Sequence, residues 1–381
     1  MADPSATNPS LTESGRADGR LDVLWICDRA TEAGGIALSL YDIYPALSSV
    51  SRIEFVAPRN ASFPILEALG ATVHKTLPRF PSVKGYVWSL LACFGMLRIA
   101  RRLKPSVIVA DHTNGLWLLL FLKAIRFPFR AIHRNHGTEF LILHPRLAKL
   151  LLSGVDQTIT DSRPEAEGLA AVTGGPVTSI PNCLPAHCLL PLEQIRKSPE
   201  DPHAPRLAYV GWLTEAKGIY AFIEVMREIR KEIPGAQGFA MGKVHSDHTS
   251  KEDEETLLSL MSSAGVVYKG QVPRDEIFRD VDILLVCSRR ESFGLTMAEA
   301  PFFGVLPIAF DSPGSSYLLS GVEGCLIENG NTLAMKNAVI AFWPDPARRE
   351  EICRRLRDRF LDQFDPKTLA DDLLALSFNK A

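Results

Sequence analysis

The sequence has no long hydrophobic run. Its longest apolar stretches, near residues 85–97 and 116–122, are shorter than the roughly 20 residues that a membrane-spanning helix needs. Residues 1–20 are polar, with Pro, Ser, Thr and Asp, and they lack the apolar core of a signal peptide. We therefore expect a disordered N-terminal tail and a cytoplasmic protein.

Cysteines are also few, and their pattern argues against a disulfide framework. There are seven, an odd number, scattered along the chain without the paired spacing of a metal site. Cys27 and Cys287 fall within apolar stretches, where a free thiol is a small apolar side chain. The pattern suits a reducing compartment.

The composition indicates a soluble globular protein. The 381 residues are 46% hydrophobic and 23% charged, which is enough to build two or three domains. Short apolar runs alternate with helical patterns, which predicts an α/β fold of parallel sheets with helices on both faces. We expect a tail at 1–20, a first domain at 21–184, a proline-rich linker at 185–205, a second domain at 206–362 and a closing helix at 363–381.

The net charge of −2 conceals a strongly basic segment. Residues 72–152 carry 13 Lys and Arg against two acids, Asp111 and Glu139, a local net charge of +11. Such a segment attracts a membrane surface, phosphates or nucleic acid. The helix predicted at Tyr86–Leu103 begins apolar and ends in arginines. It is either a core helix whose cations complement its dipole or an amphipathic helix on an anionic bilayer.

One stretch of the second half combines a strand, a turn and a helix. Residues 281–286 are expected to form a buried parallel strand, followed by a glycine-containing turn and a helix that opens near Leu295. The free amides and positive dipole end of a first helical turn make an anion site. Glu291 lies on the turn and Glu299 further into the helix, so both carboxylates can approach one ligand. A phosphate between two hydroxyl-binding carboxylates fits a nucleotide sugar.

This block resembles the signature of the retaining glycosyltransferases of family four, which have the GT-B fold. Glu291 and Glu299 enclose Phe293-Gly294-Leu295, as the family's glutamates do. Further likenesses are Gly34-Gly35 after the first strand, His136-Gly137 after a later strand, Ile180-Pro181-Asn182 and Lys217-Gly218. The resemblance implies two Rossmann-like domains, an interdomain cleft and a C-terminal helix that crosses back to the first domain.

The resemblance also implies roles for single residues. The catalytic residues would be Glu291, His136 and Lys217. Glu291 would bind sugar hydroxyls near the diphosphate, Lys217 would hold the leaving diphosphate's charge, and His136 would contact the donor sugar. Glu299 would bind ribose hydroxyls, and the loop at Val272 would hold the base through its main chain. The donor-binding set is Gly35, Lys217, Val272, Phe293, Gly294, Leu295, Thr296 and Glu299. His133, inside a strand pattern, is interpreted as a core residue.

One position departs from the family pattern. Trp212 stands where the family has an arginine on the donor diphosphate. A lysine is a point charge and does not replace that bidentate clamp. Arg289, Arg290 or a basic residue of the facing domain would have to substitute for it. Otherwise donor affinity or activity would suffer.

These features predict a retaining hexosyltransferase that needs no metal or other cofactor. A nucleotide sugar would be its donor and a glycan or lipid-linked molecule its acceptor, in polysaccharide or glycolipid synthesis at the cytoplasmic face of a membrane. Nucleic acid is not expected as a partner. Two alternatives stay open: a nucleotide-sugar epimerase or hydrolase on the same fold, and a catalytically silent binding subunit, which Trp212 makes plausible.

Overall fold

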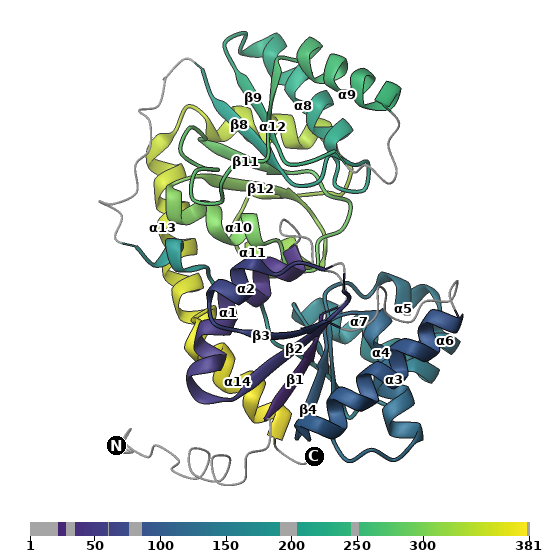
Figure 1. Ribbon diagram of the computed structural model, residues 1–381. Coiled ribbons are helices and arrows are strands. Elements are labelled where there is room, and N and C mark those ends of the chain that lie inside the picture. Colours follow the sequence, from purple (N-terminus) through teal and green to yellow (C-terminus); the bar gives the residue numbers. More distant parts are fainter. Residues whose placement is uncertain are drawn as a thin grey trace, which may run out of the picture. The chain divides into compact units, whose positions relative to one another are not determined.

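The chain forms two compact units (Figure 1). Unit 1 comprises Met1–Cys183 and Pro366–Ala381, and unit 2 comprises Leu184–Asp365. The computed structural model describes residues 22–27, 35–59, 61–75, 86–190, 204–244 and 251–378. The tail predicted at residues 1–20, Gly34 and most of the predicted linker lie outside these residues.

Unit 1 is built on a parallel sheet. Its strands are β1 (Val23–Ile26), β2 (Ile53–Ala57), β3 (Thr72–Lys75), β4 (Val107–Ala110), β5 (Arg130–Asn135), β6 (Gln157–Thr160) and β7 (Val177–Ser179). They pair in the order β3-β2-β1-β4-β5-β6-β7, each pair parallel. The chain extends the sheet from β1 to β3 and then returns to place β4 beside β1. That reversal is the switch point at which doubly wound sheets bind ligands.

Helices cover both faces of this sheet. They are α1 (Gly35–Val50), α2 (Pro64–Ala68), α3 (Tyr86–Leu103), α4 (Thr113–Ala124), α5 (Glu139–Leu143), α6 (Pro145–Leu152), α7 (Arg163–Thr173) and α14 (Pro366–Phe378). Alternate residues of β1 point to opposite faces. Leu24 and Ile26 join a core with α3, α4 and α6, whereas Trp25 packs near Phe55 on the face of α1, where the Tyr44 ring meets Phe55. The chain's last helix, α14, packs against α1 and β5 and so completes unit 1.

Unit 2 repeats this plan. Its strands are β8 (Arg206–Val210), β9 (Gln237–Met241), β10 (Val266–Gly270), β11 (Ile283–Val286), β12 (Leu306–Phe310) and β13 (Leu326–Ile327), paired in parallel in the order β10-β9-β8-β11-β12-β13. Its helical segments are η1 (Ala186–Leu189), α8 (Ile219–Glu232), α9 (Lys251–Ser263), α10 (Leu295–Glu299), η3 (Ala300–Phe303), α11 (Pro313–Leu319), α12 (Thr332–Phe342) and α13 (Pro346–Gln363). The switch point lies between β8 and β11, so the loops after these two strands emerge side by side.

The predicted α/β architecture is confirmed, with differences at some elements. Strand β5 runs to Asn135, two residues beyond His133, because Asn135 pairs with Thr160 of β6. Helices α5, α6 and α11 were not predicted from the sequence. Pro145 and Pro313 stand at the first positions of α6 and α11, where a missing N–H costs nothing. In the described residues no helix has the length and apolarity to cross a bilayer.

Candidate active site

Two loops meet at the switch point of unit 2. The loop after β8 carries Lys217, and the loop after β11 carries Glu291. Lys217 Nζ lies 2.8 Å from Glu291 Oε1, although 74 positions separate them in the sequence. Their side chains are 37% and 16% exposed, so the pair lies at the surface of unit 2 and can receive a ligand. The structure thus brings together the two residues predicted to bind the donor's sugar and diphosphate.

A glycine allows this approach. Gly218 has φ 81°, and a Cβ there would lie 1.9 Å from the carbonyl oxygen of Cys287. No larger residue would let the β8 loop rest on the end of β11. The amide of Arg289 donates to the carbonyl of Ala216 at 3.2 Å, and the Ser288 hydroxyl donates to Glu291 Oε1 at 2.6 Å. The carboxylate is therefore fixed from two sides.

A third loop, after β12, anchors the backbone of Glu291. The Glu291 amide donates to Ser312 Oγ at 3.3 Å, and the Gly314 amide donates to the Glu291 carbonyl at 2.7 Å. A Cβ on Gly314 would lie 2.6 Å from the Phe293 backbone nitrogen and oxygen. The loop after β12 therefore supports the turn that carries Glu291.

The turn at Gly294 aims the start of α10. Gly294 has φ 95°, a left-handed conformation that suits glycine, and its carbonyl accepts from the amides of Met297 and Ala298. Phe293 is buried and packs edge-on against Phe364, with ring centroids 5.2 Å apart. Its side chain belongs to the core, so its predicted donor contact concerns its amide. Leu295 and Thr296 are half-buried in the first turn of α10.

Glu299 is buried, with 1% of its side chain exposed. Its Oε1 accepts from Arg274 Nη2 at 2.6 Å and Nε at 3.1 Å, and its Oε2 lies 3.4 Å from His187 Nε2. Burial would raise the pKa of Glu299, but Arg274 and His187 outweigh it and lower the pKa. Sequence reasoning missed both partners. The one available signal for Arg274 was its place in the loop of Val272.

Trp212 is half-buried, and the Tyr209 hydroxyl donates to its carbonyl at 2.5 Å. The guanidinium of Arg289 pairs with Glu215 at 3.0 Å, and both side chains are more than 70% exposed. Such exposed pairs hold weakly, so Arg289 is free to turn toward an anion. That Arg289 or Arg290 replaces the missing arginine stays a prediction.

In unit 1, His136 follows β5 and lies between two carboxylates. Its Nδ1 is 2.8 Å from Asp161 Oδ2, its Nε2 is 3.6 Å from Asp111 Oδ1, and its side chain is 5% exposed. Burial lowers the pKa of His136, but chiefly Asp161 outweighs that effect and raises the pKa to about 9. The two aspartates directly follow the predicted strands on either side, a signal that sequence reasoning did not use. The predicted contact with a donor sugar stays a prediction.

His133, by contrast, is fully buried within β5, which confirms its interpretation as a core residue. Burial is the main cause that lowers its pKa to about 3. Gly35 begins α1 and is exposed. Residues 28–34 before it lie outside the described residues, and the predicted donor contact of Gly35 stays a prediction.

One pair of aspartates has the spacing of a metal motif. Asp280-Val281-Asp282 has Asp-x-Asp spacing, but Asp282 is buried and accepts from the Arg206 amide at 2.9 Å and its Nη2 at 2.7 Å. This carboxylate therefore ties the starts of β8 and β11 together. The described residues hold no group of three or more His, Cys, Asp and Glu arranged for a metal ion.

Two doubly wound parallel sheets, with a Lys–Glu pair at one switch point, define an α/β protein of the Rossmann-like type. Residues 33–186 match the family described as Glycosyltransferase Family 4, and residues 192–359 match Glycosyl transferases group 1. Together these two matches cover most of the chain. The chain therefore belongs to the glycosyltransferases of group 1 and Family 4, and it has their two-unit GT-B fold.

Solved structures share this fold over most of the chain. Anabaena HepE in complex with UDP and glucose superposes with a TM-score of 0.77 at 18% identity, covering 94% of this chain and 100% of that one. Sucrose-phosphate synthase from Thermosynechococcus elongatus gives a TM-score of 0.76 at 18% identity, covering 94% of this chain and 98% of that one.

Curated relatives match over shorter stretches. Trehalose synthase of Pyrococcus horikoshii is 26% identical over 175 residues, which are 43% of this chain and 41% of that protein. The GtfA subunit of the UDP-N-acetylglucosamine–peptide N-acetylglucosaminyltransferase of Streptococcus parasanguinis is 31% identical over 141 residues, 36% of this chain and 26% of that subunit. The chain therefore spans less than half the length of these relatives.

Proposed function

We propose that this protein is a retaining glycosyltransferase that moves a hexose-type sugar from a nucleotide diphosphate sugar to a glycan or lipid-linked acceptor. The observation that carries this proposal is the pair of Lys217 and Glu291 at the switch point of unit 2, beside the Gly294 turn. A cation and a carboxylate thus lie at the turn that leads into the first turn of α10. Anabaena HepE, which has the same fold, was solved with UDP and glucose and with UDP-glucose.

The geometry suggests how the site would act. A donor diphosphate offers Lys217 two negative charges, so it would draw the ammonium from Glu291. Lys217 and the amides of Leu295 and Thr296 would then stabilise the charge of the leaving diphosphate. Glu291, still held by Ser288, would accept hydrogen bonds from sugar hydroxyls. Because a protein cation supplies the positive charge, we expect turnover to persist in EDTA.

The test is a panel of nucleotide sugars and nucleoside diphosphates in a thermal-shift assay, followed by turnover with the best donor. We expect stabilisation by at least one nucleoside diphosphate and transfer only when an acceptor is present. NMR of the product would show the donor's anomeric configuration. Donor consumption without acceptor would favour the epimerase or hydrolase alternative. Binding by no nucleotide would favour the silent subunit.

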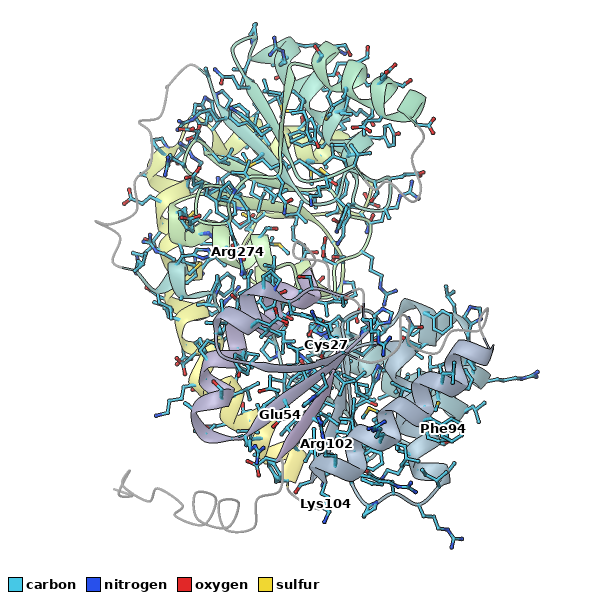
Figure 2. All side chains as sticks on the ribbon, viewed as in Figure 1. Cys27, Glu54, Phe94, Arg102, Lys104 and Arg274 are labelled. Atoms are coloured by element: carbon cyan, nitrogen blue, oxygen red, sulfur yellow. The ribbon has the colours of Figure 1, made fainter. Side chains whose placement is uncertain are left out.

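We further propose that unit 1 docks on an anionic membrane surface through α3. Leu91, Phe94, Arg98 and Arg101 recur at helical spacing and are all exposed, Phe94 to 61%. Arg102 and Lys104 continue the charge at the helix end (Figure 2). Exposed Phe140, Leu143 and Leu150 with exposed Arg146 and Lys149 add the same combination on α5 and α6. Apolar side chains among cations suit the interface of an anionic bilayer.

Sedimentation with vesicles tests this surface. We expect binding to phosphatidylcholine vesicles that contain phosphatidylglycerol, weaker binding at high salt, and little binding to pure phosphatidylcholine. Arg98→Glu with Arg101→Glu should abolish it. Arg227→Glu with Arg355→Glu, an equal charge change at exposed positions of unit 2, is the matched control. No binding of the wild type at low salt would contradict the proposal.

A further inference from the structure

The two carboxylate oxygens of Glu299 differ in the hydrogen bonds that they accept. Oε1 accepts two hydrogen bonds from Arg274, through Nη2 and Nε. Oε2 is buried, lies 3.4 Å from His187 Nε2, and receives no hydrogen bond from the described residues. Leaving a buried carboxylate oxygen unsatisfied is costly. One acceptor position of this otherwise fixed carboxylate therefore suits a hydroxyl from a ligand.

Arg274 and His187 come from different elements that converge on Glu299. Arg274 lies in the loop after β10, two positions beyond Val272, and its side chain is 20% exposed (Figure 2). His187 lies in η1 and is 19% exposed, with its ring 5.9 Å from that of Phe303. Arg274 thus ties the loop proposed to hold the base to the carboxylate proposed to hold the ribose.

We propose that Arg274 and His187 are positioning residues for ribose recognition: Arg274 fixes Oε1 of Glu299, and His187 flanks Oε2, which then accepts a ribose hydroxyl. This inference rests on the proposed function, because it needs a nucleotide at the site. A buried acceptor held in place rejects a ligand that lacks the matching hydroxyl, since the carboxylate oxygen would stay unpaired. Arg274 should therefore control discrimination between ribose and deoxyribose more than affinity as such.

Calorimetry on the full chain tests this, with UDP, GDP and their 2′-deoxy and 3′-deoxy forms. The wild type should bind the ribonucleotide about tenfold or more tightly than at least one deoxy form. Arg274→Gln should bring that ratio close to one. Arg274→Lys keeps the positive charge but loses the paired Nη2 and Nε donors of the guanidinium. This variant and His187→Gln should give intermediate ratios. Arg279→Gln, an exposed arginine nearby that pairs with Glu276, should leave the ratio unchanged.

The outcomes distinguish the proposed role of Arg274 from the proposed function of the whole protein. If Arg274→Gln and Arg274→Lys weaken ribo and deoxy forms equally, the arginine is only structural and the inference is wrong. Should Arg274→Gln fail to fold, the ratio in Arg274→Lys decides alone, and a wild-type ratio there overturns the inference. A wild type that binds nucleotides without discrimination overturns the ribose role of Glu299 and this inference, but leaves nucleotide binding intact. A wild type that binds no nucleotide overturns the proposed function as well.

Discussion

Single residues decide where backbone segments meet at the site. Gly218 and Gly330 both have positive φ, 81° and 82°, but a Cβ meets Cys287 O at Gly218 and open space at Gly330. Gly330→Ala should therefore cost only the left-handed strain, about 1–2 kcal/mol. Gly218→Ala should cost several kcal/mol more in denaturant unfolding and lower turnover, because the Lys217 loop must move. Equal losses in the two variants would contradict this account of the loop.

Replacement of Glu291 and of Glu299 should have different effects on transfer and on nucleotide binding. Glu291→Ala removes the carboxylate that lies beside Lys217, so transfer should be abolished while nucleotide binding largely remains. Glu299→Ala should mainly weaken nucleotide binding. Steady-state kinetics and calorimetry on both variants measure the two effects. Near-normal turnover in both would remove these assignments.

At the scale of an element, β5 contains one histidine and is directly followed by another, and their pKa values shift in opposite directions. The pKa of His133 is lowered to about 3, mainly by burial, with His112 and His136 adding to it and Asp111 opposing. The pKa of His136 is raised to about 9 by Asp161 and Asp111 against burial and Arg134. An unfolded histidine titrates near 6.5.

These shifts predict a maximum in the stability of unit 1 near pH 6.5. Between pH 6.5 and 3 His133 binds a proton in the unfolded chain but stays neutral in the folded protein, so stability falls as the pH falls. Between pH 6.5 and 9 folded His136 keeps a proton that the unfolded chain loses, so stability falls as the pH rises. On each side, the free energy of unfolding changes by about 1.4 kcal/mol per pH unit. Denaturant unfolding across this range measures both limbs, and His133→Phe should flatten only the acid one. An unchanged acid limb in that variant would count against the assignment.

At the scale of the whole molecule, unit 1 depends on the end of the chain. Helix α14 buries Leu369, Ala370 and Leu373 against unit 1. Removal of residues 366–381 should therefore deprotect α1 and β5 in hydrogen exchange while β8 and β11 stay protected. Leu373→Ala should cost about 2–5 kcal/mol, and exposed Asp371→Ala less than about 0.5 kcal/mol. Uniform deprotection of both units would show that the effect is not confined to unit 1.

The parallel α/β architecture and the strand, turn and helix around Glu291 and Glu299 could be predicted from the sequence alone. Periodicity and local turn chemistry involve neighbours in the chain, so they can be read without knowing the fold. The sequence pattern also placed His133 in a core strand. The prediction failed at α5 and α6, which are only five and eight residues long and so carry little periodicity.

Which side chains meet could not be predicted, because it depends on how the chain folds back on itself. Lys217 and Glu291 become partners because β8 and β11 are neighbours although β9 and β10 come between them in the chain. Asp111 and Asp161 meet His136 for the same reason, because they follow β4 and β6, the neighbours of β5. Arg274 and His187 converge on Glu299 from a loop and a short helix that are distant from it in the sequence. Strand order in a doubly wound sheet brings the carboxyl ends of distant strands to one edge, and no local pattern records that order.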